Sequence, residues 1–281
     1  SRVITARIMG KKKTGGTVEF LLTEKTPDGW KALGRPARLR ENMEIEIFSK
    51  KEESCMVKIC RKYDDGRFIV QCPENILDYG YIPLPPYINS RREVVGSDYH
   101  TYQTVFSEHA GSVASPTSCL HFTQNLISEI EGKGIEFAPV TLHIGPGTFR
   151  PGNKPPEEEK YSISSRSAQI LNKAERVCVC GTTVMRTLET VYNGSGFKSR
   201  SGITDLFIEP GYQFKSSSMF LTNFHLPGTS LLLMVAAYIE QFCPGKGREK
   251  VIELYSMALE NDFKFLSYGD AMLLIGDENS E

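Results

Sequence analysis

A helical pattern that leads directly into a strand pattern, between residues 123 and 150, constrains the fold of this chain more than any other feature. Thr123 can cap the helix, whose apolar residues recur on one face, and glycines follow its end. Residues 140–144 alternate apolar and polar side chains and run into a loop, residues 145–150, with two glycines. Ligands of open α/β sheets bind beyond the carboxyl ends of strands. The sequence therefore predicts an α/β domain with a ligand site at this loop.

The chain after residue 86 continues to alternate strands and helices, as α/β domains do. Apolar runs at residues 177–180, 204–208 and 219–222 predict short strands, and residues 231–239 predict a strongly apolar helix. We expect the α/β domain to span residues 86–281.

The first 85 residues predict a small all-β barrel instead. Short apolar-rich runs begin at residues 3, 17, 43, 57 and 68, and turn signals such as Asp65-Gly66 separate them. Residues 83–87 are rich in proline, which fixes φ and removes a donor, so we expect an extended connector there. Tyr87 in this connector could pack on the surface or stack on an unpaired base.

The composition excludes several classes of protein. The seven cysteines, an odd number at irregular spacing, do not predict a disulfide framework. A net charge of −1 does not by itself indicate nucleic-acid binding, although it allows a local basic face. We find no signal peptide and no apolar stretch near 18 residues, so we expect a soluble, cytoplasmic protein.

A second candidate site follows the strand predicted at residues 177–180. Gly181, Thr182 and Thr183 form a glycine turn and a helix start, where free N–H groups and the helix dipole favour an anion. An ordinary strand–helix joint with a threonine cap is the alternative, because the full phosphate-loop spacing is missing. Arg186 and Glu189, three residues apart on that helix, could pair on its surface.

Three histidines, His121, His143 and His225, lie at the ends of predicted elements beside small residues. Imidazole transfers protons near neutral pH, so each is a candidate catalytic base; a buried histidine that only braces the backbone is the alternative. Asn223 and His225 share strand parity, so both could point to one face. The histidines lack the close spacing of zinc ligands, and we expect no metal.

Motifs along nearly the whole chain resemble one enzyme family. They are RVITARI, WKALGRP, YQTVF, GSVASPTSCLHFT, VTLHIGPGTFRP, CGTTVMRTLE, TDLFIEPGYQF, LTNFHLP and YGDAMLLIG. Each motif alone is weak, but the ordered set resembles the S-adenosylmethionine:tRNA ribosyltransferase-isomerase family of queuosine biosynthesis. The resemblance implies an α/β domain with a small inserted all-β barrel, six-stranded and Greek-key-like, at residues 1–85. In that family a further segment precedes the barrel, whereas this sequence opens near the first barrel strand.

The resemblance also implies a reaction. The family transfers and isomerises the ribosyl part of S-adenosylmethionine onto 7-aminomethyl-7-deazaguanine in a tRNA wobble position, giving epoxyqueuosine-tRNA, adenine and methionine. The implied partners are tRNA and S-adenosylmethionine, which is consumed as a substrate, with no membrane. A base must remove a C5′ proton, and the target base must leave its stack to reach a pocket.

The candidate site residues fall into three groups. The candidate bases are His121, His143 and His225. Contacts to S-adenosylmethionine are expected from Gly145, Gly147, Thr148, Phe149, Gly181, Thr182, Thr183 and Arg186, with the two glycine segments lining one pocket. Contacts to the tRNA substrate are expected from Tyr102, Thr117, Asn223, Tyr268 and Asp270, and from Arg35, Arg38 and Arg40 on phosphates. Asn223 could orient His225 or hold the ribose.

Residues 157–159 form an acidic run that we expect to be solvated. The family usually has His-x-Met-His-x-Glu here, and only Glu159 fits it. Two other functions remain open. One is an RNA-binding barrel on a non-catalytic scaffold, which would not need the hydroxyl-rich and histidine-bearing loops. The other is a nucleotide-dependent hydrolase, for which we find no convincing metal-binding carboxylate near Gly181.

Overall fold

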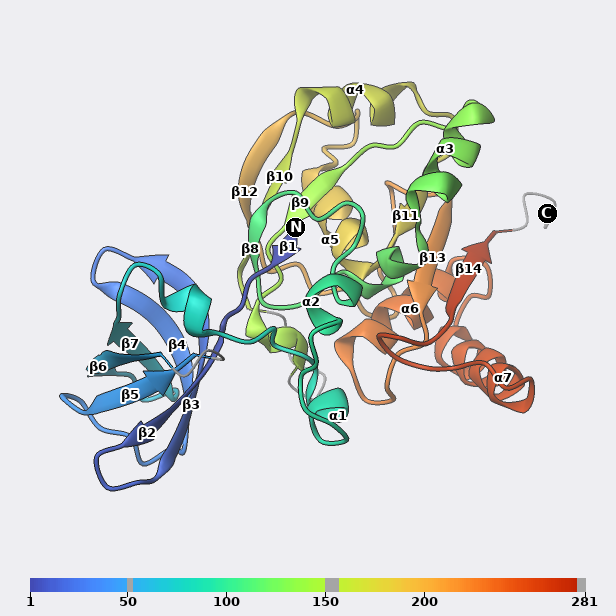
Figure 1. Cartoon of the computed structure of the whole chain (residues 1–281). Coiled ribbons are helices and arrows are strands. Elements are labelled where there is room, and N and C mark those ends of the chain that lie inside the picture. Colours follow the sequence, from blue (N-terminus) through green and yellow to red (C-terminus); the bar gives the residue numbers. More distant parts are fainter. Residues whose placement is uncertain (50–52, 150–156, 277–281) are drawn as a thin grey trace. The chain divides into compact units, whose positions relative to one another are not determined.

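The computed structural model describes residues 1–49, 53–149 and 157–276. The chain forms two compact units (Figure 1). The barrel unit comprises Arg2–Tyr102 and Glu108–Ser115, and the α/β unit comprises Ser1, Gln103–Ser107 and Pro116–Glu281. The domain border predicted after residue 85 stays a prediction, because compactness alone does not define a functional domain.

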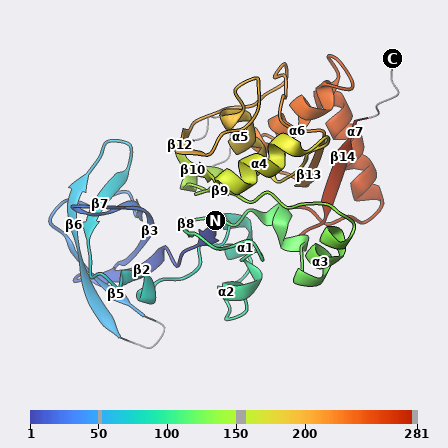
Figure 2. The same cartoon turned by 90° about the horizontal axis from the view of Figure 1, so that it is seen from above.

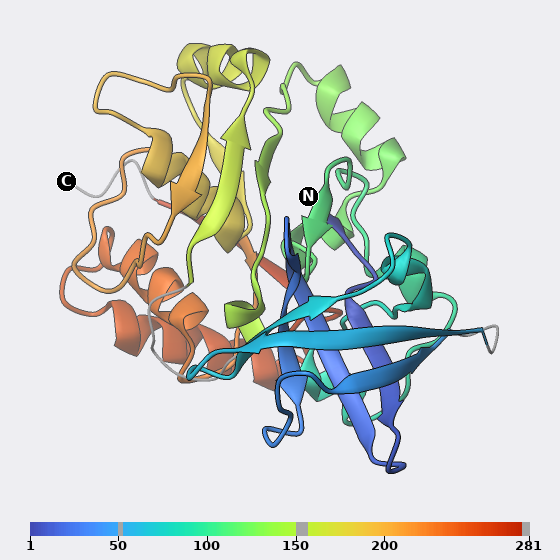
Figure 3. The same ribbon diagram turned by 90° about the vertical axis from the view of Figure 1, so that its left-hand side faces the viewer.

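Six antiparallel strands close into a barrel, as predicted (Figure 3). Their order around the barrel is β2-β3-β4-β7-β6-β5, and β5 returns beside β2, which gives the first four strands a Greek-key arrangement. The strands are β2 (Arg7–Lys12), β3 (Thr17–Thr26), β4 (Gly29–Arg35), β5 (Glu44–Phe48), β6 (Ser54–Lys62) and β7 (Arg67–Gln71).

Alternate residues of these strands fill the barrel. The rings of Phe20 and Phe68 meet edge to face inside it, with centroids 6.1 Å apart. Gly34 lies against them, and a Cβ there would approach the Phe68 ring to 2.8 Å. The missing side chain of Gly34 therefore makes room for the aromatic pair.

The chain around the barrel differs from two predictions. Residues 3–8 are not one barrel strand, because β1 (Arg2–Val3) pairs in parallel with β8 (Ala110–Ser112), and Val3 packs with Ile82, Leu84 and Tyr102. The proline-rich connector is extended only to Pro85. Pro86 begins helix α1 (Pro86–Asn89), because a first helical position needs no N–H. The remaining elements are η1 (Ile76–Tyr79) and α2 (Asp98–Thr101).

Two three-stranded sheets and their helices make up the described part of the α/β unit (Figure 2). The first sheet, β12-β10-β9, is antiparallel throughout, and in the second, β11-β13-β14, only β11 and β13 are parallel. The strands are β9 (Val140–Leu142), β10 (Glu159–Ile163), β11 (Cys178–Cys180), β12 (Arg200–Thr204), β13 (Met219–Asn223) and β14 (Ala271–Ile275). The helices are η2 (Thr117–His121), α3 (Gln124–Gly132), η3 (Pro146–Phe149), α4 (Ser165–Lys173), α5 (Thr182–Val191), α6 (Ser230–Glu240) and α7 (Gly247–Glu260).

Among the described strands of the α/β unit, the rule that ligands bind at carboxyl ends of parallel strands therefore applies to β11 and β13, whose carboxyl ends share one edge. The strand predicted at residues 204–208 is wrong. β12 ends at Thr204, whose Oγ1 accepts a hydrogen bond from the Leu206 N–H at 3.2 Å and turns the chain out of the sheet. Ile208 is buried, so its apolar run indicated burial rather than a strand.

Helices α3 and α6 begin close to the predicted positions. The hydroxyls of Thr123 and Thr229 each accept a hydrogen bond from the backbone N–H three residues on, at 3.2 and 3.4 Å. Tyr238 of α6 packs edge to face on Phe220 of β13, which fixes α6 against the second sheet. Within the described ranges, no helix has the length and apolar character needed to cross a membrane.

Candidate active site

One buried amide joins three segments at the carboxyl end of β13. Asn223, the last residue of that strand, is 2% exposed. Its Oδ1 accepts hydrogen bonds from the hydroxyls of Thr117 and Ser118 in η2, both at 2.9 Å. Its Nδ2 donates to the Asp270 carbonyl at 3.5 Å. Asn223 thus fixes two hydroxyls beside the strand end.

The turn from β11 into α5 lies beside the same hydroxyls. Gly181 has a φ of 90°, which only glycine adopts readily, and its N–H donates to the Leu221 carbonyl at 2.8 Å. A Cβ on Gly181 would lie 3.6 Å from the Ser118 Oγ. No side chain caps α5, which begins at Thr182. Its first N–H groups and the helix dipole therefore offer a site for an anion.

His225 follows β13 and is held at two points. Its Nε2 lies 2.9 Å from the Thr222 Oγ1, and its backbone N–H donates to the Tyr255 hydroxyl at 2.9 Å. Burial lowers the pKa of His225 to about 4, so its imidazole is neutral at pH 7. Successive strand residues face opposite sides, so Thr222 and Asn223 point apart. The ring contacts Thr222, whereas the hydrogen bonds of the Asn223 side chain go to Thr117, Ser118 and Asp270. That Asn223 orients the ring stays a prediction.

A buried ion pair ties the loop after β9 to the second turn of α5. The side chains of Glu159 and Arg186 are 6% and 9% exposed, and Arg186 Nη1 donates to Glu159 Oε2. Glu159 Oε1 accepts from the Gly145 N–H at 2.8 Å, and Arg186 Nε donates to the Leu206 carbonyl at 3.0 Å. The two glycine segments are therefore linked through these side chains. That they line one pocket stays a prediction.

Two predictions about charged residues are wrong. Glu159 is not solvated, unlike the exposed Glu158, because it pairs with Arg186 inside the unit. Arg186 does not pair with Glu189 on the helix surface. Glu189 is 9% exposed and accepts hydrogen bonds from the Tyr212 hydroxyl at 3.0 Å and the Ser216 N–H at 2.9 Å. The two charged residues of helix α5 therefore bind different parts of the chain: Arg186 binds Glu159, and Glu189 binds the segment from Tyr212 to Ser216.

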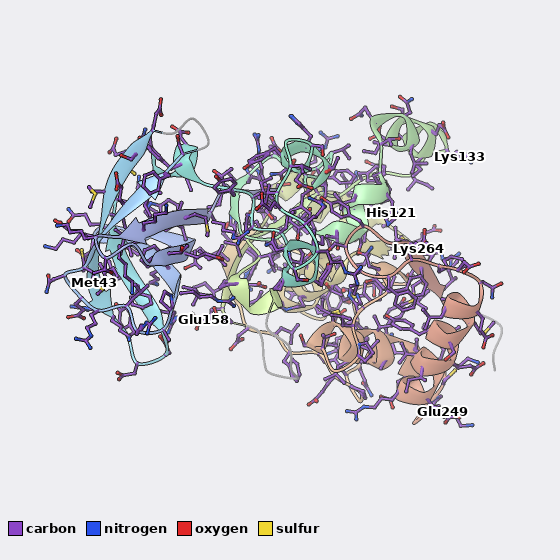
Figure 4. All side chains as sticks on the ribbon, turned by 60° about the horizontal axis from the view of Figure 1, so that its bottom comes forward. Met43, His121, Lys133, Glu158, Glu249 and Lys264 are labelled. Carbon is purple, nitrogen blue, oxygen red and sulfur yellow. The ribbon has the colours of Figure 1, made fainter. Side chains whose placement is uncertain are left out.

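The other two histidines occupy different surroundings. His121 is exposed at the end of η2 and is labelled in Figure 4. The next residue, Phe122, is anchored against Phe106 and Phe137, with ring centroids 5.6 and 6.0 Å away. His143 is half-buried, and its backbone N–H donates to the Lys160 carbonyl at 2.9 Å, which prolongs the pairing of β9 with β10. Which histidine acts as a base stays a prediction.

The loop predicted to bind S-adenosylmethionine is a 3-10 turn, η3, which contains Gly147, Thr148 and Phe149. A Cβ on Gly147 would lie 3.7 Å from Glu157. The side chains of Thr148 and Phe149, and all of Arg150, lie outside the described residues.

The remaining substrate-binding candidates fall in both units. Asp270 holds its own loop, because its Oδ2 accepts from the Lys264 N–H at 2.6 Å, and Tyr268 in that loop is 44% exposed. Tyr102, Arg35 and Arg38 belong to the barrel unit. Tyr102 is buried in the cluster around Val3, whereas the two arginines are exposed. Their contacts with tRNA stay predictions.

Several residues of this site were not predicted from the sequence, including Ser118, Thr222 and the role of Glu159. A signal for Glu159 was present: it alternates with Tyr161 and Ile163, which are both buried, so strand parity placed a carboxylate inside, where it needs a partner. Ser118 gave no such signal, because its partner Asn223 lies 105 residues away.

The arrangement supplies three kinds of group near the carboxyl ends of β11 and β13. Uncapped N–H groups suit a carboxylate, fixed hydroxyls suit sugar hydroxyls, and a neutral imidazole can accept a proton. In the described ranges, no group of three His, Cys, Asp or Glu side chains is placed to hold a metal ion.

Comparison with known proteins assigns the chain to a family. The family described as "Queuosine biosynthesis protein" matches residues 1–274, nearly the whole chain. The chain belongs to this queuosine biosynthesis family. The resemblance drawn from the ordered motifs is thereby confirmed.

Members of the family from several bacteria align with 98% of the chain under the name S-adenosylmethionine:tRNA ribosyltransferase-isomerase. The one from Syntrophomonas wolfei is 41% identical over 293 residues, 80% of its length. Those from Thermus thermophilus and Aquifex aeolicus are 39% and 38% identical, each over 82% of its length. The crystal structure of S-adenosylmethionine tRNA ribosyltransferase from Thermotoga maritima is 29% identical, with a TM-score of 0.48 over 98% of this chain and 80% of that one.

Proposed function

We propose that this protein is an S-adenosylmethionine:tRNA ribosyltransferase-isomerase. It transfers and isomerises the ribosyl group of S-adenosylmethionine onto 7-aminomethyl-7-deazaguanine in tRNA, giving epoxyqueuosine-tRNA, adenine and methionine. The observation that carries this proposal is the shared name of relatives about 40% identical along 98% of the chain. It favours this function over an RNA-binding scaffold or a hydrolase. The enzyme acts in the cytoplasm, where tRNA is modified.

The residues near β11 and β13 fit S-adenosylmethionine as a substrate. The hydroxyls of Thr117 and Ser118 both donate to Asn223, so their oxygens remain acceptors for ribose O–H groups. Asn223 positions these hydroxyls. The uncapped start of α5 at Thr182 suits the carboxylate of the methionine part.

His225 is our choice for the group that accepts or relays the C5′ proton. It is neutral at pH 7, oriented by Thr222, and two residues beyond Asn223. His225→Gln should lower the turnover number by about a hundredfold or more, with little change in S-adenosylmethionine affinity. Full turnover of this variant would transfer the role to His121 or His143.

The reaction itself is tested by adenine release. The protein is incubated with S-adenosylmethionine and a tRNA that carries 7-aminomethyl-7-deazaguanine, and adenine is measured by chromatography. We expect release that depends on this base, and no release with the same tRNA carrying guanine. Binding of both substrates without adenine release would contradict the proposed function.

A further inference from the structure

One end of the barrel gathers three chain segments that are separate in the sequence. Antiparallel strands place the β2–β3 turn, the loop between β4 and β5, and the β6–β7 turn at the same end, as the pairing of Leu33 with Arg67 and of Lys62 with Phe68 requires. We call these segments, residues 11–16, 35–43 and 61–67, the loop end. Figure 4 labels Met43, the last residue of the middle segment.

The loop end carries an excess of cations over carboxylates. Lys13 pairs with Glu44, and Arg67 pairs with Asp65. The other cations form no ion pair with a described carboxylate; they are Lys11, Lys12, Arg35, Arg38, Arg40, Arg61 and Lys62. Residues 1–85 contain 16 Lys and Arg against 12 Asp and Glu, whereas the rest of the chain contains 17 against 22. The net charge of the whole chain is slightly negative although residues 1–85 carry a surplus of cations.

The loop between β4 and β5 is anchored, so its arginines are held in place. Leu39 has no exposed surface, while Arg38 and Arg40 on either side of it are exposed. Lys62 fastens the loop twice, since its Nζ donates to the Ala37 carbonyl at 2.9 Å and its N–H donates to the Glu41 Oε1 at 2.8 Å. A buried leucine between two exposed arginines presents both guanidinium groups with little loss of backbone entropy on binding.

An exposed aromatic ring lies in the same end. The guanidinium of Arg61 lies over the ring of Tyr63, 5.9 Å from its centroid, and Tyr63 is 37% exposed. Arginine planes and aromatic rings are the surfaces on which unpaired nucleic-acid bases stack.

At the opposite end of the barrel, carboxylates outnumber cations among the described turn residues. Its described turn residues include the exposed Asp28, Glu53 and Glu74. Lys31 there pairs with Glu24, and Lys25 is an exposed cation. Among the described residues, cations therefore prevail at the loop end and carboxylates at the opposite end.

We infer that the loop end binds tRNA, with Arg38, Arg40 and Arg61 on backbone phosphates and Tyr63 stacked on an unpaired base. The inference rests on the proposed function for the identity of the RNA. Phosphate neutralisation releases counterions, so each contact adds to the salt dependence of binding.

The test measures binding of a fluorescein-labelled tRNA transcript by anisotropy, at about 50 to 200 mM KCl. We compare the wild type with a triple variant, Arg38→Ala, Arg40→Ala and Arg61→Ala. The triple variant should reduce the slope of log K against log salt by about 2 to 3 and weaken binding at low salt at least about tenfold. The matched triple Arg→Lys variant and Lys25→Ala at the opposite end should keep the wild-type slope.

Tyr63 is tested separately from the charges. Tyr63→Ala should weaken tRNA binding about five- to hundredfold with an unchanged salt slope, and Tyr63→Phe should bind like the wild type. Equal binding by Tyr63→Ala and the wild type would overturn the stacking contact.

Adenine release separates failure of this surface from failure of the proposed function. If the wild type releases adenine and the triple alanine variant keeps the wild-type slope and affinity, the surface is wrong and the function stands. If the surface is right, the triple variant should show a higher KM for tRNA and nearly the same kcat, with unchanged S-adenosylmethionine binding by calorimetry. A wild type that binds tRNA without releasing adenine would contradict the function whatever the slopes are.

Discussion

At the residue scale, the protonation state of His225 links the site to stability. Its pKa is about 4 in the folded protein, whereas a histidine in an unfolded chain titrates near 6.5. Between these values the unfolded chain binds more protons, so falling pH favours unfolding. The neutral imidazole therefore costs no stability above about pH 7, and the cost grows as pH falls from 6.5 toward 4.

The variant His225→Gln removes this titration and should flatten the pH dependence of stability. The wild type should lose about 2 kcal/mol more unfolding free energy than His225→Gln between pH 7.5 and pH 5. Urea unfolding at the two pH values measures this difference. Equal losses of unfolding free energy in the two proteins would show that the pKa of His225 does not differ between the folded and unfolded states.

A second residue-scale feature is the thiol pair at the edge of the site. The Sγ atoms of Cys119 and Cys180 lie 3.3 Å apart. The hydrogen bond between the two thiols lowers the pKa of Cys119 and, together with burial, raises the pKa of Cys180. The thiolate is the reactive form of cysteine, so Cys119 is the favoured nucleophile of the pair.

A thiol-oxidising reagent such as diamide should therefore form a disulfide bond between Cys119 and Cys180, with both thiol hydrogens passing to the reagent. Mass spectrometry of the digested protein should find this cross-linked peptide first, and dithiothreitol should reverse it. Cys119→Ser should lose it. Oxidation that instead couples the exposed Cys60 or Cys178 would contradict the expected order.

At the scale of elements, short-range chemistry was predictable and long-range pairing was not. Thr123 and Thr229 marked helix starts because a capping hydroxyl bonds an N–H three residues away. The end of β12 at Thr204 was missed, because its apolar run continued while a side-chain hydrogen bond turned the backbone. Glu159 was missed as a partner of Arg186, since no local pattern specifies a contact 27 residues away.

The Glu159–Arg186 pair should behave as one unit that fixes the loop after β9 to α5. Glu159→Gln leaves the buried Arg186 cation without its carboxylate and should cost about 3 to 5 kcal/mol of unfolding free energy. The double variant Glu159→Gln with Arg186→Met removes both charges and should cost less than the single variant. Urea unfolding of the wild type, Glu159→Gln, Arg186→Met and the double variant gives the coupling free energy between the two side chains. If the losses of the two single variants simply add up in the double variant, the two residues do not act as one unit.

At the scale of the whole molecule, a small barrel was predictable because turn signals repeat locally, whereas its six strands and the family followed from the resemblance of the ordered motifs. Which chain segments belong to each unit was not predictable. Ser1 and Gln103–Ser107 belong to the α/β unit, while Glu108–Ser115 belongs to the barrel unit, so the chain passes between the units several times. Whether a segment belongs to one unit or the other depends on tertiary packing, which local periodicity does not report.

Binding of S-adenosylmethionine should stabilise the whole chain against thermal unfolding. A ligand that binds only the folded state stabilises it by about 2.7 kcal/mol at one hundred times its dissociation constant. For a chain of this size, this corresponds to a rise in melting temperature of about 5 to 10 °C. Because Asn223 fixes the hydroxyls of Thr117 and Ser118, Asn223→Ala should lose most of the rise, whereas the triple arginine variant of the loop end should keep it. Differential scanning fluorimetry with S-adenosylmethionine, and with methionine or adenine alone as controls, measures these shifts. A wild-type melting temperature unmoved at concentrations that support adenine release would show that the folded chain does not form the site before tRNA binds.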